Sequence, residues 1–359
     1  MNKKQLILGV IVLALLAGLL IWGRDRIHFD FGVFRAQLAL ADWRKIGIGA
    51  ACIYMAYIFR SVRWAMLLRH NKKVHPLSLL GTQVMGFTAV ALIGRIADPV
   101  RPYLVSKKTG MSLSSQFAVY VVDRLFDAGS MAFIFSSAIL LTAWFGQPGA
   151  LPHPEIVKKA GYGGLALTIA GALFLVAVRM TGDVVASFFE STFGLISKKF
   201  GLAVGDKIRS FRTGLDMMRS FSDFAVAASL SIGMWLLIAF SYLETTQAFV
   251  ASPQLAAMTP AKCVLLMALS GVSSVIQLPI IGWFTQIGIV AAAISNFFGV
   301  APEAATACAA TILLVTFLCI IPVGLIWAQI DHVSLRKVAH ESEHAGEGLT
   351  PEESTSAAE

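Results

Sequence analysis

Charged side chains within apolar segments are the residues of this chain that are most able to do chemistry. Arg60 and Arg63 lie in a long apolar run and, three positions apart, share one face of a helix. Each such charge costs about 2.5–3.5 kcal/mol at the centre of a membrane helix, so its presence needs a reason. A guanidinium offers a fork of donors that matches phosphate oxygens, which predicts a phosphate clamp. The alternative is that both side chains reach back to the membrane interface.

Two further clusters carry the same signal. They are Arg95, Asp98 and Arg101 in a stretch with prolines and a glycine, and Asp123, Arg124 and Asp127 at the start of an apolar run. Arg124 and Asp127 can pair along one helix face, so a purely structural ion pair remains an alternative for them. The three clusters place five arginines and three aspartates in one half of the chain. A partly buried cavity rich in arginine suits an anionic headgroup such as a lipid phosphate.

Polar residues in the apolar segments of the second half are the remaining candidates, namely Glu244, Gln277 and Gln286. Hydrogen bonding between helices is the simpler interpretation of each. His340 and His344 match the zinc-peptidase pattern H-E-x-x-H, but they lie in an acidic tail that we expect to be disordered. With no nucleotide-binding or nucleophile motif either, the sequence predicts no enzyme, no cofactor and no metal.

The elements that must position these residues are membrane helices. The 359 residues are 57% hydrophobic and 14% charged, whereas soluble domains carry about 25% charged residues. Apolar runs of about 20 residues are long enough for membrane helices, and strand-like alternation is absent, so a helical bundle is favoured over a barrel. The runs are 5–22, 46–68, 117–145, 161–178, 224–250, 263–298 with an interruption, and 304–328. The net charge of +8 flanks these runs, which indicates anionic lipid rather than nucleic acid.

Two segments do not fit simple spans. The segment 77–105 is broken by Gly94, two prolines and three charged residues, with basic residues on both sides, which predicts a re-entrant hairpin from the cytoplasm. The segment 260–298 is broken at 277–288 and has no Lys or Arg in its flanks 251–259 and 299–303, which predicts a hairpin from the outside. Such a pair indicates an inverted repeat with a substrate site near the midplane. Eight ordinary spans are the alternative.

The distribution of basic residues predicts orientation. With the N-terminus inside, the cytoplasmic segments hold more than twice as many lysines and arginines as the external ones. We therefore predict an all-α protein of the cell inner (cytoplasmic) membrane with six full spans, two re-entrant hairpins and both termini cytoplasmic. We expect residues 180–221 to form amphipathic helices on the cytoplasmic surface. Residues 331–359 are expected to form an acidic, disordered tail.

The charged motifs, in their order along the chain, resemble a known family. Arg-Ser-Val-Arg-Trp from Arg60, Gly-Arg from Gly94 with Asp-Pro-Val-Arg-Pro-Tyr from Asp98, and Asp-Arg-Leu-Phe-Asp from Asp123 are similar to the flippase-like transmembrane domain of lysylphosphatidylglycerol synthases. The resemblance covers about residues 6–330. It implies a domain over 1–330 that moves charged or glycosylated lipids between leaflets. It also implies that the headgroup is bound by Arg60, Arg63, Arg101 and Arg124, and that Asp98 and Asp127 hold these arginines in place.

Departures from the family pattern bear on the substrate. The family often has Pro-Gly-Arg-x-Gly-Glu where this chain has Ile-Gly-Arg-Ile-Ala-Asp at 93–98, and Gln286 stands where an acid is expected. Because 29 residues follow Ile330, we expect a stand-alone member without the aminoacyl-transfer domain and without synthase activity.

The function predicted from these observations is a lipid translocase for an anionic or glycosylated lipid. Its partners would be membrane lipids with anionic headgroups and, as a candidate, a glycosyltransferase or lipid-synthesis enzyme; the sequence sets no oligomeric state. One alternative is a non-catalytic scaffold for a lipid-linked glycosyltransferase, docked on 180–220. Another is a membrane-embedded lipid-modifying transferase, which needs a nucleophile or a metal near the arginines.

Overall fold

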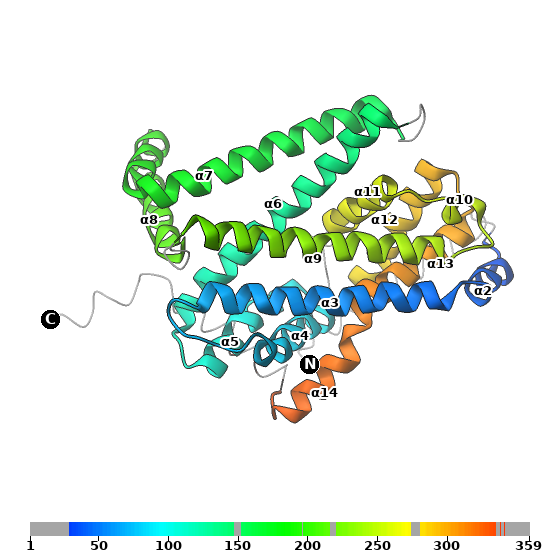
Figure 1. The fold of residues 1–359 in the computed structure, drawn as a ribbon, viewed down its shortest axis with the longest axis horizontal. Coiled ribbons are helices and arrows are strands. Elements are labelled where there is room, and N and C mark those ends of the chain that lie inside the picture. Colours follow the sequence, from blue (N-terminus) through cyan, green and yellow to red (C-terminus); the bar gives the residue numbers. More distant parts are fainter. Residues whose placement is uncertain are drawn as a thin grey trace, which may run out of the picture.

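The described part of the chain folds into a bundle of helices. The computed structural model describes residues 29–146, 152–195, 197–215, 220–273 and 281–334, together with 338 and 341. Within these ranges every regular element is a helix and there is no strand, which confirms the predicted all-α class (Figure 1).

Five helices in the described ranges are long and apolar enough to cross a membrane. They are α3 (Trp43–Leu68), α4 (Pro76–Ile93), α6 (Leu113–Phe145), α9 (Phe221–Gln247) and a last one made of α13 (Pro302–Leu313), η3 (Leu314–Leu318) and α14 (Ile320–Ile330). The helix α7 (Pro154–Gly194) adds a sixth if its two arms, bent by 82°, form one span. A multi-pass membrane protein is thereby confirmed, and the span predicted at 5–22 lies outside the described residues.

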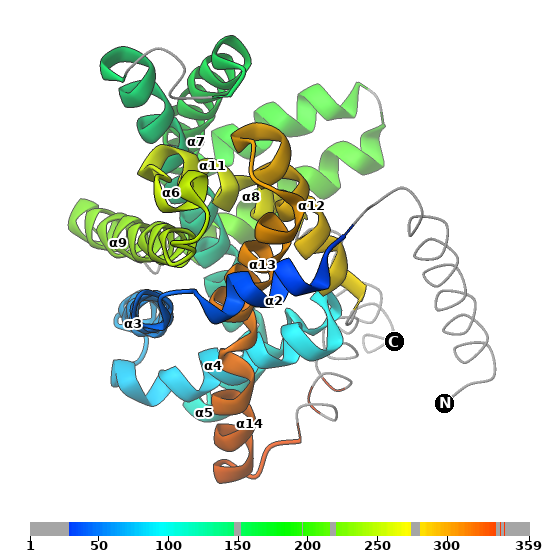
Figure 2. The same ribbon diagram turned by 90° about the vertical axis from the view of Figure 1, so that its right-hand side faces the viewer.

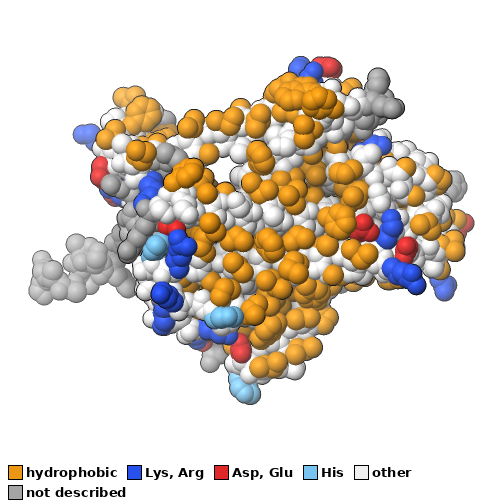
Figure 3. Space-filling model, viewed as in Figure 1, with side chains coloured by type: hydrophobic (Ala, Val, Ile, Leu, Met, Phe, Trp, Pro, Cys, Tyr) orange, Lys and Arg blue, Asp and Glu red, His pale blue; other side chains and the backbone are white. Residues whose placement is uncertain are grey.

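The outer surface of the bundle is apolar over a broad area. Large hydrophobic side chains such as Leu167, Leu173 and Leu236 are exposed. On the face in Figure 3, hydrophobic side chains cover the middle of the molecule, and charged side chains gather toward its two ends. Soluble monomers rarely expose apolar patches of this extent, whereas a bilayer covers such a belt.

The helices α3 and α9 lie antiparallel and side by side at the centre of the fold (Figure 1). Gly49 makes their close approach possible, because a Cβ atom there would lie 2.9 Å from Oγ1 of Thr245. Small residues let membrane helices pack closely without a hydrophobic driving force between them. Figure 2, which views α3 end-on, shows α4 and α14 together on one side of it and α6 with α7 on the other.

The start of α9 is tied to the end of α3. Ser220 and Asp223 form a capping box, in which each side chain accepts a hydrogen bond from the backbone N–H of the other residue. The buried Asp223 carboxylate also contacts Arg69 and, at 2.9 Å, Nε2 of His70. One carboxylate therefore caps α9 and holds α3 against it.

The first predicted break occurs after α4. The chain turns at Gly94, whose φ of 93° suits a residue without a Cβ atom. It then forms the short helix η1 (Arg95–Ala97) and α5 (Val100–Thr109), which packs against α4. This confirms a break in 77–105 but not its path through the membrane, because α4 alone is as long as a span. The re-entrant hairpin stays a prediction.

The second predicted break separates α11 (Pro260–Ser273) from α12 (Ile281–Phe298), which contact each other. The connection 274–280, and with it Gln277, lies outside the described residues. The helix α11, with 14 residues, is shorter than the spans, and α12, with 18 residues, is as long as α4. A long helix, a broken pair and another long helix thus occur in both halves, but the inverted repeat stays a prediction.

The described part of the segment 180–221 is helical, and its place on the cytoplasmic surface stays a prediction. The helix α7 bends by 82° between its arms Pro154–Phe174 and Ala177–Gly194, and its backbone is non-helical at Thr181, close to the predicted end of the apolar run at 178. The next helix, α8 (Lys198–Leu215), folds back on it, and Arg209 pairs with Glu190 at 2.6 Å. Residues 180–215 therefore form a helical hairpin whose arms pack on each other. The short helices α2 (Phe31–Ala39) and α10 (Pro253–Ala256) lie at the opposite end of the bundle (Figure 1).

Candidate functional site

The deepest part of the site is an ion-pair network between α3 and α6. Arg63 is 1% exposed and donates from Nε and Nη2 to Oδ1 of Asp123, at 2.9 and 2.5 Å. Its Nη2 also lies 2.7 Å from Oδ1 of Asp127, and its Nη1 donates to the hydroxyl of Ser231 on α9 at 2.5 Å. Every nitrogen of this guanidinium is therefore engaged, and the side chain points into the bundle rather than back to an interface.

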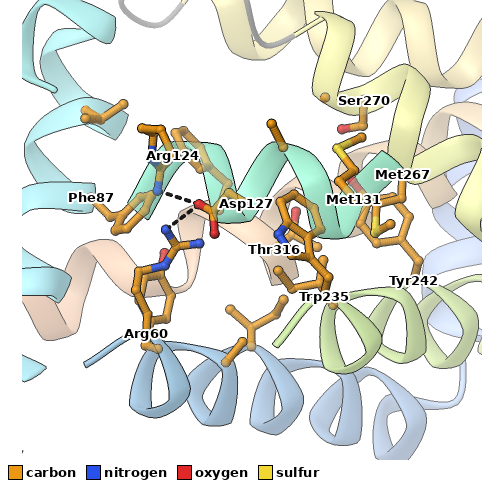
Figure 4. Close-up of a pocket in the computed structure, with 18 of the residues that line it drawn as sticks. Arg60, Phe87, Arg124, Asp127, Met131, Trp235, Tyr242, Met267, Ser270 and Thr316 are labelled. Atoms are coloured by element: carbon orange, nitrogen blue, oxygen red, sulfur yellow. Dashed lines mark hydrogen bonds and ion pairs between the residues drawn. The ribbon is translucent and has the colours of Figure 1, made fainter. Parts of the chain in front are cut away.

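A second pair of arginines shares the carboxylate of Asp127. Nη1 of Arg60 lies 2.8 Å from Oδ2 of Asp127, and Nη2 of Arg124 lies 2.6 Å from the same oxygen (Figure 4). The spacing of Arg124 and Asp127 predicts their pairing, and the structure contains it. Arg124 also reaches Asp123 at 3.2 Å. Asp127 consequently binds three guanidinium groups at once.

Arg101 completes the network from α5 and is the least satisfied of its members. Its side chain is fully buried, and its guanidinium lies over the rings of Phe87 and Tyr120, at 4.3 and 4.9 Å from their centres. Its carboxylate neighbours are more distant, with Asp98 at 3.5 Å and Asp123 at 3.9 Å. Nε and Nη1 find no hydrogen-bond partner among the described residues. A buried cation with unused donors is a site that an anion would stabilise.

Arg95 and Asp98 form the outer edge of the cluster. Nη1 of Arg95 lies 3.8 Å from Oδ2 of Asp98; the Arg95 side chain is exposed, and that of Asp98 is partly buried. Counted together, five arginines face three aspartates, so the described cluster carries an excess of two positive charges. Buried charge of one sign is expensive in a low-dielectric interior. The excess therefore favours binding of an anion.

A cavity of about 380 Å³ opens beside the network. Its charged end is lined by Arg60, Arg95, Asp98, Arg124 and Asp127. Apolar and aromatic side chains form most of the remaining wall, among them Tyr57, Phe87, Met131, Trp235, Met267 and Phe317. Figure 4 shows Arg60, Arg124 and Asp127 at one end and Tyr242, Met267 and Ser270 at the other. The cavity is thus amphipathic, as a site for a lipid headgroup would be.

The predicted site residues separate into those that face the cavity and those behind it. Arg60, Arg95, Arg124, Asp98 and Asp127 line the cavity, and Gln286 joins them from α12. Arg63, Arg101 and Asp123 are buried in the network behind this wall. Glu244 is not among the described residues that line the cavity, and Gln277 lies outside the described residues.

The sequence prediction missed the contribution of α9. Trp235, Ile238 and Tyr242 line the cavity, and Ser231 binds Arg63 one turn earlier. These positions recur at spacings of three and four residues, so they share one helix face. The presence of a serine, a tryptophan and a tyrosine on one face of an apolar helix was the available signal.

Metal binding finds no support in the described part of the chain. No group of three or more His, Cys, Asp or Glu residues there could hold a metal ion. His340 and His344 of the zinc-peptidase pattern lie outside the described residues.

The fold and the site together define a class, that of multi-pass helical membrane proteins with a buried arginine–aspartate site. The chain matches the lysylphosphatidylglycerol synthase transmembrane region over residues 6–324 and belongs to that family. The resemblance of its charged motifs is thereby confirmed. No curated protein matches the chain. Membership of this family gives the protein a function related to membrane lipids.

Proposed function

We propose that the protein is a lipid translocase that moves an anionic lipid between the two leaflets of the membrane. The observation that carries the proposal is the arginine-rich network, with its two excess positive charges, at one end of a cavity that is otherwise largely apolar. A phosphate headgroup would meet the arginines, and the rest of the cavity would shield the polar group from the bilayer core.

The arginines at the cavity surface are arranged to exchange one anion for another. Arg60 and Arg124 both donate to Oδ2 of Asp127, so two guanidinium groups already converge on a single anionic oxygen. A phosphate oxygen offers the same chemistry and forms strong, charge-assisted hydrogen bonds with arginine. Arg63 and Asp123 would keep the two helices in register while Asp127 and the lipid exchange partners. Arg101 and Asp98 lie on the first broken helix pair, formed by α4 with η1 and α5, and would change their contacts as this pair moves.

A transport role agrees better with the cavity than an enzymatic one. Hydroxyl groups line the described cavity at Tyr57, Tyr242, Ser270 and Thr316, but no histidine or cysteine is among the described lining residues as a base or a nucleophile. We therefore assign no catalytic activity to the protein.

We place the protein in the cytoplasmic membrane with both termini inside. Its candidate partner is an enzyme of lipid synthesis or glycosylation.

Reconstitution tests the proposal directly. Purified protein in vesicles that contain phosphatidylglycerol with a fluorescent acyl chain should increase the fraction of label that moves between leaflets, read by quenching with dithionite. The assay is run with and without an imposed membrane potential and proton gradient. We expect Arg60→Gln and Arg124→Gln to reduce the rate at least tenfold, in line with the loss of charge-assisted hydrogen bonds worth about 1.5–3 kcal/mol.

The matched control is Arg44→Gln, which removes an exposed arginine from the same helix α3 at its far end. This variant should transport like the unmodified protein. Transport that persists when Arg60 and Arg124 are both replaced would refute the assignment of these residues. Lipid binding without any transport above protein-free vesicles would favour the scaffold instead.

A further inference from the structure

The end of the cavity opposite the arginines holds a second polar group, which is uncharged. Trp235 and Tyr242 reach it from α9, Ser270 from α11, Gln286 from α12 and Thr316 from η3. Figure 4 shows Trp235 and Thr316 between the charged cluster and the pair of Tyr242 and Ser270. Each buried polar group requires a partner. Gln286 bonds Ser270, and Tyr242 interacts with Ser270 and Thr316, so these four side chains find partners among themselves.

The indole of Trp235 is the clearest sign of a missing ligand. Its Nε1 is buried and has no hydrogen-bond partner among the described residues. A buried tryptophan N–H normally finds an acceptor, and an unpaired donor is costly. Since Trp235 lines the cavity, an oxygen atom of a bound molecule could supply the acceptor.

The neighbouring groups add both donors and acceptors. Gln286 and Ser270 are more than nine-tenths buried, and Nε2 of Gln286 donates to the Ser270 hydroxyl at 2.7 Å. The amide oxygen of Gln286 can only accept, and a serine hydroxyl can do both. The hydroxyl of Thr316 donates to the backbone oxygen of Ile312 at 2.7 Å and keeps its acceptor capacity. A mixed set of this kind complements hydroxyl groups, which also donate and accept.

This end of the cavity has no acid to receive a cationic group. Among the described lining residues the acids are Asp98 and Asp127, and both already belong to the arginine network. The connection 274–280 contains no Asp or Glu either. An ammonium group placed here would be buried without a counter-charge and close to an excess of arginines, which is unfavourable.

The distance between the two ends suits a headgroup substituent. On α9, Trp235 and Tyr242 are seven residues apart, and on α3 the lining residues Ile53 and Arg60 have the same separation. Seven residues of a helix rise about 10 Å. A phosphate held by Arg60 and Arg124 could therefore extend one small polar substituent toward Trp235 and Gln286, whereas acyl chains would have to leave the cavity sideways.

We infer that the substrate is an anionic lipid whose phosphate carries a neutral, hydroxylated substituent, such as a glycerol or a cyclic polyol, and that Trp235, Ser270 and Gln286 recognise it. This inference rests on the proposed function and names the lipid class that the same cavity takes. The far end of the cavity selects against headgroups that end in an ammonium group.

Four short-chain lipids that differ in the substituent alone test the inference. They are the dioctanoyl forms of phosphatidylglycerol, phosphatidylinositol, phosphatidylethanol and phosphatidylethanolamine, titrated into the detergent-solubilised protein and followed by native mass spectrometry. At least one of the two hydroxylated lipids should bind about tenfold more tightly than phosphatidylethanol, as two hydrogen bonds would produce. Whether glycerol or inositol binds better identifies the polyol. Phosphatidylethanolamine should bind more weakly than phosphatidylethanol.

Two variants localise the effect. Trp235→Phe removes the unpaired N–H, and Gln286→Leu removes the amide, and each should weaken the preferred hydroxylated lipid about fivefold while leaving phosphatidylethanol unchanged. Trp144→Phe is the control, because Trp144 is exposed and bonds Tyr162 outside the cavity. The comparison of lipids on the unmodified protein remains decisive if a variant fails to fold.

Equal affinity for phosphatidylethanol and both hydroxylated lipids would overturn the inference, as would tighter binding of phosphatidylethanolamine. These results differ from a failure of the proposed function. In that case no anionic lipid would bind above the detergent background, or Arg124→Gln would leave the affinity for all four lipids unchanged.

Discussion

Replacing Arg63 by glutamine should destabilise the fold far more than the same replacement of Arg124, although both arginines bind the same two carboxylates. Arg63 is 1% exposed and lies 2.5 Å from Asp123 and 2.7 Å from Asp127. Arg124 contacts these acids at 3.2 and 2.6 Å, but a third of its side chain is exposed at the cavity. The pair of variants therefore separates a residue that holds the helices together from a residue that we propose to bind the lipid.

The size of the difference follows from burial. Arg60, Arg101 and Arg124 approach Asp123 at Oδ2, so without Arg63 the Oδ1 atom of this fully buried carboxylate loses the guanidinium that binds it. Breaking a buried ion pair in this way costs about 3–5 kcal/mol. Arg63 also bonds Ser231, so its loss affects α3, α6 and α9 together. The pairs of Arg124 are partly screened, and Arg60 still neutralises Asp127 at 2.8 Å when Arg124 is gone. For Arg124→Gln we expect a loss of about 1 kcal/mol or less.

Equilibrium unfolding by sodium dodecyl sulfate in mixed micelles, followed by circular dichroism, measures both free energies of unfolding. Lipid affinity should show the opposite order, with a loss of tenfold or more for Arg124→Gln from one charge-assisted hydrogen bond. Arg44→Gln controls for the loss of a charge on α3. Equal destabilisation by the variants of Arg63 and Arg124 would refute the division of roles between the two arginines.

Three further changes test how the fold holds the site. Gly49→Ala should destabilise the protein by about 1–3 kcal/mol, because the added Cβ atom would crowd Thr245. The control Gly47→Ala, where no atom lies within 4 Å of the added Cβ, should leave stability unchanged or higher. Equal effects of the two variants in unfolding titrations would contradict this packing. Gly94→Ala should cost about 1–2 kcal/mol because φ is 93° there, and an unchanged unfolding curve would count against the turn. Ser220→Ala removes the cap of α9 and should cost about 1 kcal/mol, measured in the same titration, and a stability equal to that of the unmodified protein would argue against this cap.

The chemistry of the site was largely predictable because its strongest signal is local. Three residues along a helix place Arg60 beside Arg63, and Arg124 beside Asp127, whatever the rest of the fold does. The cost of charge in a membrane then requires that such clusters face inward. Their meeting in one network follows from these two facts, and the structure contains it.

Which arginine faces the cavity was not predictable from spacing. Two residues three apart on a helix differ by about 60° in direction. That rotation puts Arg60 at the cavity wall and Arg63 in the helix interface, where Ser231 of α9 meets it. The assignment depends on the position of α9, which no local pattern specifies. For the same reason, Trp235 could not be placed in the cavity from the sequence.

The end of the fourth apolar run shows the same limit in the fold. Arg179 ends that run, so the sequence favours a span up to 178 and a separate surface segment after it. The structure has an 82° bend at this point, and α8 packs on the arm that follows it, with Arg209 bound to Glu190. An apolar stripe on a helix is the same whether lipid or a neighbouring helix covers it. Helical periodicity therefore predicts the helix but not its partner.

The sharing of Asp127 by three arginines has a consequence for the proposed transport. Arg60 and Arg124 are both bound by this carboxylate. An incoming phosphate must therefore compete with it and gains only the difference between two similar interactions. A site made of unpaired arginines would hold a phosphate too tightly to release it. A translocase needs binding that is strong enough for selection and weak enough for release.

By this reasoning Asp127→Asn, if the fold tolerates the change, should tighten lipid binding at least tenfold and slow transport in the vesicle assay. Weaker binding together with unchanged transport would exclude competition between Asp127 and the phosphate.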